Sequence, residues 1–327
     1  MIASMNSLLL RVFAVVLVLS VLTVIRRRNT QRNFLRSLQP LTPIPTPERS
    51  PYWVKTTHVA LLQQTLADLS QIPWGSDPLE DEQEAQNRYR EGHVALIAMS
   101  GNWGKAPEAT QHFLHCPKPL AYTGVAETIH ALSYVSGYRY VPLGIAAATE
   151  WTTEAIKLAP QCPEAWIERT IILSKGLSRA HLLLAEMALA QSQAIAPDHP
   201  RLPSAEFAVY TRRRQYAQAE QAVRRSLAYA DEGRLSIAER RALLNSLAIN
   251  LDVQRKVPEA ITIYRTLTTD FPDYAWGWHN GSQALLRTGE LEEALQFSDH
   301  AIALMPFPLA LQTNAKIRQK LAQVAQK

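Results

Sequence analysis

The sequence predicts an all-α protein in which a solenoid of helical hairpins follows one N-terminal transmembrane helix. Three observations support this prediction. Ala, Leu and Gln dominate a chain of 327 residues with only 12 glycines, a composition that favours helices. Residues 8–25 form an apolar run of the length that spans a bilayer. Two adjacent segments, 241–274 and 275–308, repeat one pattern of large and small residues.

The apolar run begins at Leu8, ends at Ile25 and contains one charged residue, Arg11. A helix of that length reaches about 27 Å, and Arg11 is near enough to its start to extend toward the lipid headgroups. We therefore assign residues 1–28 to a transmembrane anchor with a basic flank. A cleaved signal peptide is the alternative, but the run ends in the arginines 26–28 and not in the small residues of a cleavage site.

Arginine is concentrated beside this run. Six of the 34 basic residues lie in 1–36 with no acidic residue, which leaves 28 basic against 29 acidic residues in the rest of the chain. The predicted folded part is therefore nearly neutral and offers no general surface for nucleic acid. Five of the arginines follow the apolar run, which predicts a single-pass membrane protein whose C-terminal part faces the cytoplasm, or the stroma of a plastid.

Three further segments surround the repeats. Residues 29–51 form a proline-rich linker, with five prolines between 40 and 51 that favour an extended spacer. Residues 52–137 are helical by pattern, either as degenerate repeats or as a separate cap. Residues 309–327 carry one apolar stripe and a basic outer face, which suits a C-terminal helix that caps the open end of a stack.

The repeated pattern is that of a helical hairpin that cannot bury its apolar face alone. The second segment carries Trp278, Ser282, Leu285, Gly289, Ala294, Ala301 and Pro306. The first carries Leu244, Ala248, Leu251, Arg255, Ala260, Leu267 and Pro272 at the same spacings. Small residues let paired helices approach closely, and a proline ends the second helix. The first segment lacks the glycine of the inner turn and has Leu267 in place of a small residue.

At these residues the two segments resemble the tetratricopeptide repeat (TPR) family, whose period is also about 34 residues. Weaker matches upstream extend the predicted TPR array over residues 138–308. The resemblance implies a right-handed superhelix of hairpins that binds protein partners. It also implies that the chain is not an enzyme and needs neither a cofactor nor a small-molecule substrate.

The TPR resemblance further implies a concave groove lined by the first helix of each hairpin. Besides Ala242, this protein-binding groove would display Asn245, Ser246, Ile249, Asp252, Trp276, His279, Asn280, Gln283 and Arg287. Amides, one tryptophan and one arginine suit an extended or helical peptide held by its backbone. An equally open interpretation of Trp276 is that it packs against the preceding hairpin.

Two patterns raise the question of bound metal or haem. His112, His115 and Cys116 have the spacing that brings three ligands to one side of a helix, but they form an incomplete metal site. The alternative is a half-buried helix end with the cysteine in the core. Cys-Pro pairs at 116–117 and 162–163 resemble short haem-responsive motifs, although prolines in these positions also suit helix starts and stops. We predict no metal site here.

Three functional hypotheses remain. The leading one is a membrane-tethered scaffold or assembly factor that binds subunits of a multi-subunit membrane complex; its architecture is similar to that of the photosystem assembly TPR proteins of cyanobacteria and plastids. The second is an adaptor in secretion, envelope biogenesis or cytochrome maturation. The third is a metal- or haem-responsive sensor, or an enzyme, that uses residues 52–137.

Overall fold

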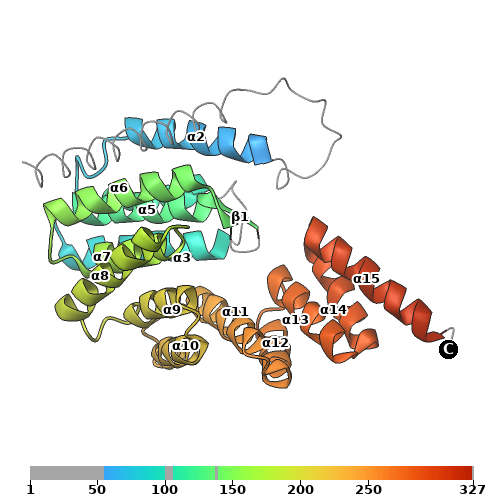
Figure 1. The fold of residues 1–327 in the computed structure, drawn as a ribbon. Helices are drawn as coiled ribbons and strands as arrows, with labels where there is room; N and C mark the ends of the chain where they lie inside the picture. Colours follow the sequence, from blue (N-terminus) through green and yellow to red (C-terminus); the bar gives the residue numbers. More distant parts are fainter. Residues whose placement is uncertain (1–54, 100–105, 137–138, 326–327) are drawn as a thin grey trace, which may run out of the picture. The chain divides into compact units, whose positions relative to one another are not determined.

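The computed structural model of this protein describes residues 55–99, 106–136 and 139–325, which all belong to one compact unit (Figure 1). The predicted anchor, 1–28, and the proline-rich linker, 29–51, lie outside these residues. Among the helices that are described, none is both long and apolar enough to cross a bilayer. The described chain is helical apart from one short β-hairpin.

The elements follow one another with short connections. In order they are α2 (Lys55–Gln71), α3 (Glu82–Met99), α4 (Ala106–Phe113), α5 (Lys118–Ser133), β1 (Tyr134–Ser136), β2 (Arg139–Tyr140), α6 (Pro142–Leu158), α7 (Pro163–Ser174), α8 (Arg179–Ile195), α9 (Leu202–Arg212), α10 (Tyr216–Asp231), α11 (Ile237–Val253), α12 (Val257–Asp270), α13 (Ala275–Thr288), α14 (Leu291–Leu304) and α15 (Pro308–Ala325). The two strands pair antiparallel, with Tyr134 opposite Tyr140.

Successive helices pack as hairpins, and the first helix of each hairpin packs on the second helix of the hairpin before it, in most cases also on its first helix (Figure 1). The pairs are α3–α4, α5–α6, α7–α8, α9–α10, α11–α12 and α13–α14, while α5 contacts α7, α7 contacts α9, and α11 contacts α13. Helix α15 packs on α13 and α14. The boundary predicted between 137 and 138 falls in the connection between α5 and α6, two helices that pack on each other.

Proline in the first turn marks the start of many of these helices. Pro142 begins α6, Pro163 begins α7, and Pro258 lies at the start of α12. Proline suits this position because its fixed φ fits the helix and its missing N–H would have no intrahelical partner there. Helix α11 begins instead with a capping box, in which the side chains of Ser236 and Glu239 each accept a bond from the other's backbone N–H.

The small residues of the two best-matched segments lie where the helices cross. Ala248, Ala260, Ser282 and Ala294 are all fully buried. Ala248, Ala260 and Ala294 belong to one core cluster that also contains Tyr264. The helix backbones therefore approach closely around the tyrosine ring. A larger residue at any of these crossings would have to push the helices apart, and overpacking of this kind costs about 1–3 kcal/mol.

The first segment accommodates its two departures from the pattern locally. Arg255 takes the left-handed conformation (φ +66°) at the inner turn where the second segment has Gly289 (φ +87°). Arg214, at the turn between α9 and α10, is also left-handed (φ +61°). Leu267 is fully buried and faces Gly277, whose missing side chain leaves room for it: a Cβ there would lie 3.1 Å from the leucine. The turn is thus strained, while the crossing is not.

Hairpin α7–α8 repeats one contact of hairpin α13–α14. The indole nitrogen of Trp166 donates to the carbonyl of Pro160 at 2.8 Å, and that of Trp278 donates to the carbonyl of Pro272 at 2.9 Å. In both hairpins the tryptophan lies six residues after the proline, on the first helix. The upstream hairpin therefore anchors its first helix as the best-matched one does.

We expect opposite changes in stability from two substitutions at equivalent turns. Arg255→Gly should raise the free energy of unfolding by up to about 1 kcal/mol, because glycine adopts the left-handed conformation without steric strain. Gly289→Ala should lower it by about 1 kcal/mol through strain alone, because open space surrounds the added methyl group. Urea denaturation of both variants measures these changes, and a loss of stability in Arg255→Gly would contradict this account of the turn.

Candidate functional site

The residues predicted to line the groove lie on α11 and α13, and two pairs of them join these helices. Nδ2 of Asn280 donates to Oδ1 of Asn245 at 3.0 Å, and the guanidinium of Arg287 pairs with the carboxylate of Asp252. In both pairs the partners are separated by 35 residues. Asn245, Asn280 and Asp252 are partly buried and Arg287 is exposed, so a binding partner could reach both pairs.

Two of the predicted groove residues turn toward the interior. His279 is only 2% exposed, and its ring lies 4.9 Å from that of Phe307, centroid to centroid. Burial lowers the pKa of His279 to about 4, so the ring is neutral at pH 7. Trp276 also packs on Phe307, at 4.5 Å. Its ring contact is therefore with the connection that leads into α15, not with the preceding hairpin.

The other predicted groove residues are half-buried. Nε2 of Gln283 lies 3.2 Å from Nε2 of His279 and 3.4 Å from Oγ1 of Thr313, which connects α13 to α15. Ile249 packs against the core cluster of the C-terminal hairpins, and Ser246 lies beside it on α11. The face that α11, α13 and α15 share is thus polar and crossed by side-chain hydrogen bonds.

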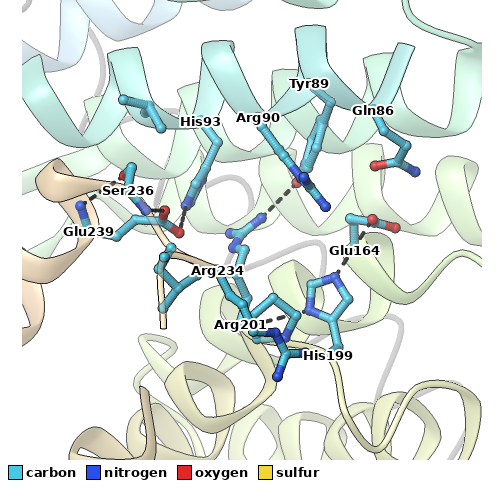
Figure 2. A pocket seen from close by; sticks show the side chains of 14 residues that line it. Gln86, Tyr89, Arg90, His93, Glu164, His199, Arg201, Arg234, Ser236 and Glu239 are labelled. Carbon is cyan, nitrogen blue, oxygen red and sulfur yellow. Dashed lines mark hydrogen bonds and ion pairs between the residues drawn. The ribbon is translucent and has the colours of Figure 1, made fainter. Parts of the chain in front are cut away.

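A pocket of about 230 Å³ lies elsewhere, among residues that sequence reasoning did not single out (Figure 2). Its polar lining comes from four parts of the chain: Gln86, Tyr89, Arg90 and His93 on α3, Glu164 on α7, His199 and Arg201 before α9, and Arg234, Ser236 and Glu239 at the start of α11. Figure 2 shows these side chains converging on one space. The pocket is large enough for a side chain or a small polar molecule.

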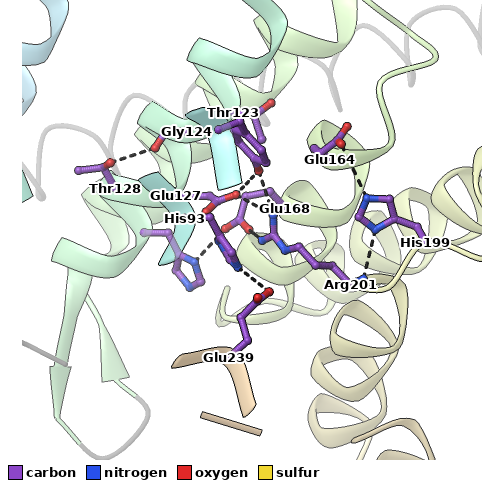
Figure 3. A network of polar contacts seen from close by, with 12 residues as sticks. His93, Thr123, Gly124, Glu127, Thr128, Glu164, Glu168, His199, Arg201 and Glu239 are labelled. Atoms are coloured by element: carbon purple, nitrogen blue, oxygen red, sulfur yellow. Dashed lines mark hydrogen bonds and ion pairs between the residues drawn. The ribbon is translucent and has the colours of Figure 1, made fainter. Parts of the chain in front are cut away.

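Behind the pocket lies a buried ion-pair network centred on Arg201 (Figure 3). Nη1 of Arg201 donates to Oε1 of Glu127 at 3.0 Å and to the hydroxyl of Tyr89 at 2.9 Å, while Nη2 donates to Oε2 of Glu168 at 3.2 Å. Tyr89 donates in turn to Glu127. Arg201, Glu127, Glu168 and Tyr89 are all at least nine-tenths buried. One guanidinium thus connects α3, α5 and α7 to the start of α9.

His93 extends the network to α11. Its Nδ1 lies 2.6 Å from Oε2 of Glu127 and its Nε2 lies 3.3 Å from Oε1 of Glu239. Burial and Arg201 lower the pKa of His93, but the two carboxylates outweigh them and raise it to about 9. The imidazole is therefore a cation at pH 7 and donates to both. A further bond, from Arg241 to the carbonyl of Ile97 at 3.3 Å, also joins α11 to α3.

Two carboxylates of the network, those of Glu127 and Glu239, remain ionised. Burial alone would raise the pKa of Glu127, but Arg201 and His93 hold it well below the usual range. Burial also opposes ionisation of Glu239, whose pKa is nevertheless lowered to about 2, chiefly by His93. Each of these carboxylates thus has a cationic partner inside the protein, and the pairs hold helices together.

Glu164 and His199 form the other wall of the pocket. Nδ1 of His199 accepts a hydrogen bond from the backbone N–H of Arg201 at 3.2 Å, so the ring's hydrogen is on Nε2, which lies 3.7 Å from Oε1 of Glu164. Burial raises the pKa of Glu164, yet His199 and neighbouring donors leave it below the usual value. The connection before α9 is thereby tied to α7 as well.

The three residues with metal-ligand spacing have separate partners. Helix α4 ends at Phe113, so Cys116 lies beyond it. His112 lies 3.2 Å from a carboxylate oxygen of Glu91, the exposed His115 lies 3.4 Å from the carbonyl of Asp77, and Cys116 is fully buried in the core. No group of three or more potential metal ligands occurs in the residues described.

Both cysteines are free thiols, and in both the thiol has a raised pKa. Burial raises the pKa of Cys116 and of Cys162 to about 12. The thiolate is the form that attacks electrophiles and binds iron, so this environment disfavours the haem-responsive interpretation of the two Cys-Pro pairs.

Comparison with known proteins finds only distant likenesses to solved structures. No protein-family model and no curated protein matches the sequence. Similar solved structures include YrrB, a TPR protein with an unusual peptide-binding site (15% identity over 60% of this chain and 91% of that chain, TM-score 0.41). A tetratricopeptide repeat protein from Parabacteroides merdae is 14% identical over 81% of this chain and 93% of that one, with a TM-score of 0.46. The likeness concerns the fold alone.

Sequence analysis missed the buried network, and the one signal that could have indicated it was a single acidic residue. Glu127 is the one acid in α5, a helix whose other residues are mostly apolar or small. A lone acid in such a helix needs a buried cation as partner. Nothing in the sequence identifies that cation as Arg201, 74 residues away.

We expect the stability conferred by His93 to depend on pH with a definite sign. The folded protein holds the imidazole proton more tightly than the unfolded chain, whose histidine has a pKa of 6.5. The contribution is therefore complete below pH 6.5 and is lost as the pH rises through about 9. Urea denaturation between pH 6 and pH 9 should show a falling free energy of unfolding, and this fall should be reduced in His93→Gln.

The matched control is His115→Gln, at an exposed histidine outside the network. It should retain the pH dependence of the wild-type chain. Equal slopes in wild type and His93→Gln would show that His93 is not protonated in the folded state.

Proposed function

We propose that this protein is a non-enzymatic, membrane-tethered TPR-type scaffold that binds protein partners during the biogenesis of a multi-subunit membrane complex. The observation that carries the proposal is the polar face shared by α11, α13 and α15. There Asn245 and Asn280 are bonded to each other, and Gln283 reaches toward the buried Thr313, while the three amides remain partly accessible. Neighbouring first helices therefore present amides in one row.

Such a row suits the backbone of a bound polypeptide. An asparagine amide carries two N–H donors and an acceptor oxygen with two lone pairs, so one bond between Asn245 and Asn280 leaves further capacity on both. The carboxylate of Asp252, paired with Arg287, lies one helical turn or more along the same two helices. Amide contacts recognise a peptide backbone with little regard to its side chains, which fits a protein that holds several related subunits.

Tethering is the second part of the proposal and rests on the sequence. The apolar run 8–25 and the arginines after it support a single span with the hairpins on the cytoplasmic or stromal side. A tether raises the effective concentration of a weak binding face near membrane subunits, so that modest affinity suffices. A photosystem-type complex is one candidate partner.

In-cell crosslinking of the tagged full-length chain, followed by mild solubilisation and mass spectrometry, tests the proposal. We expect the wild-type chain to recover subunits of one membrane complex. Asn245→Ala with Asn280→Ala should reduce that recovery about tenfold, because it removes the amide row without leaving one member of the bonded pair unsatisfied. Trp276 is a poorer choice for substitution, because its loss would leave a cavity beside Phe307.

The matched control replaces another exposed amide pair. Nε2 of Gln83 donates to Oδ1 of Asn87 at 3.1 Å on α3, and Gln83→Ala with Asn87→Ala should leave recovery unchanged. Equal recovery by all three chains would exclude the shared face of α11, α13 and α15 as the binding surface. Recovery of the protein alone would count against the scaffold itself.

A further inference from the structure

The surface around α8 exposes an unusual number of large apolar side chains. Ten such side chains are exposed among the residues that the structure describes, and five of them lie between 158 and 187. Three belong to α8: Leu183 is 52% exposed, Leu184 44% and Met187 65%. Contiguous apolar surface on a folded domain marks an interaction site more often than chance exposure.

Beside these side chains lies an apolar groove of about 260 Å³. Leu184 and Met187 line it from α8, Ile156 from α6 and Trp166 from α7. Helices α6 and α8 are the second helices of neighbouring hairpins, so this groove is distinct from the face formed by the first helices α11, α13 and α15. Methionine and tryptophan are enriched at protein-binding surfaces because their side chains offer large contact areas and need few hydrogen-bond partners.

One charged side chain in this groove has no acidic partner. Nη1 of Arg169 donates only to neutral oxygens, namely the hydroxyl of Thr153 at 2.7 Å, the hydroxyl of Thr152 at 3.3 Å and the carbonyl of Thr149 at 3.2 Å. No carboxylate forms an ion pair with it in the described chain. Its pKa is lowered by burial, with no nearby acid to oppose the shift. A half-buried guanidinium without a counter-charge is unfavourable, and a carboxylate placed there would form a charge-assisted bond.

We propose that the groove between α6 and α8 binds a segment of a partner protein that carries aliphatic side chains and one carboxylate, with the carboxylate paired to Arg169. The groove volume accommodates one or two aliphatic side chains against Leu184 and Met187. The exposed Lys157 at its edge adds a second positive charge, although it also pairs with Glu154. Arginine is the residue best suited to fix the orientation of such a segment, because its planar guanidinium binds both oxygens of a carboxylate.

A second copy of this chain fits the groove less well. A two-fold interface would bring the same patch of both subunits together and place Arg169 and Lys157 near their own copies. A lipid surface fits poorly for another reason: the unpaired guanidinium lies within a groove, where a side chain can reach it and a flat bilayer surface cannot.

The proposal is tested with a phage-displayed library of random 16-residue peptides, selected on the immobilised full-length chain in detergent micelles. Selection on the wild-type chain should enrich peptides in which Asp or Glu is flanked by Leu, Ile or Met. A representative synthetic peptide should bind Met187→Lys at least tenfold more weakly. Arg169→Glu should instead enrich Lys or Arg at the position of the acid.

Two controls keep the test independent of folding and of the proposed function. Leu311→Lys alters a comparably exposed side chain on α15 (48%) and should bind the peptide like wild type, as should Asn245→Ala with Asn280→Ala. Met187 is mostly exposed, so its substitution leaves the fold intact even if that of Arg169 does not.

Three results would overturn the proposal. The first is equal peptide binding by Met187→Lys and wild type, and the second is an enriched peptide family without acidic residues. The third is self-association, or binding to phosphatidylglycerol vesicles, that is present in wild type and lost in Met187→Lys. That third result would assign the surface to a second copy or to lipid.

Discussion

The guanidinium of Arg201 lies in the interior between the carboxylates of Glu127 and Glu168, and the arrangement of the first five hairpins depends on these contacts. A buried charge is tolerated only when its partners are in place, and removal of one partner from such a pair typically costs about 3–5 kcal/mol. Each partner of Arg201 lies on a different helix. The first helices α3, α5 and α7 are therefore held to the start of α9 by the polar bonds of Arg201 as well as by apolar packing. Helix α11 joins them through the contacts of His93 with Glu127 and Glu239.

The C-terminal hairpins use a different means of stacking. Small buried residues such as Ala248 and Ala294 let their helices approach, and one apolar cluster runs from α10 to α15. Polar bonds between these helices, such as that between Asn245 and Asn280, are partly exposed and so are worth less than those of Arg201. This difference leaves the side chains of α11 and α13 available to a partner, whereas Arg201, Glu127 and Glu168 are buried behind the pocket beside α3.

The sequence was sufficient to predict those parts of the fold that depend on the local spacing of residues. The 34-residue pattern predicted the helices of 241–308, because small residues and helix-breaking prolines act over one or two turns. It did not predict the network, in which Arg201 alone bonds residues 33 to 112 positions away and no spacing rule applies. The orientation of Trp276 and His279 was missed for a similar reason, since it depends on Phe307 in a later connection. Arg169 could not be recognised from sequence, because its lack of an acidic partner is a property of the folded chain.

Hydrogen exchange of Arg201→Gln tests most directly whether one buried guanidinium holds these helices together. The account predicts faster amide exchange in α3, α5, α7 and the first turns of α11 at once, with exchange in α13, α14 and α15 unchanged. Faster exchange confined to the residues around position 201 would contradict it, because the first helices would then be held by their apolar contacts alone.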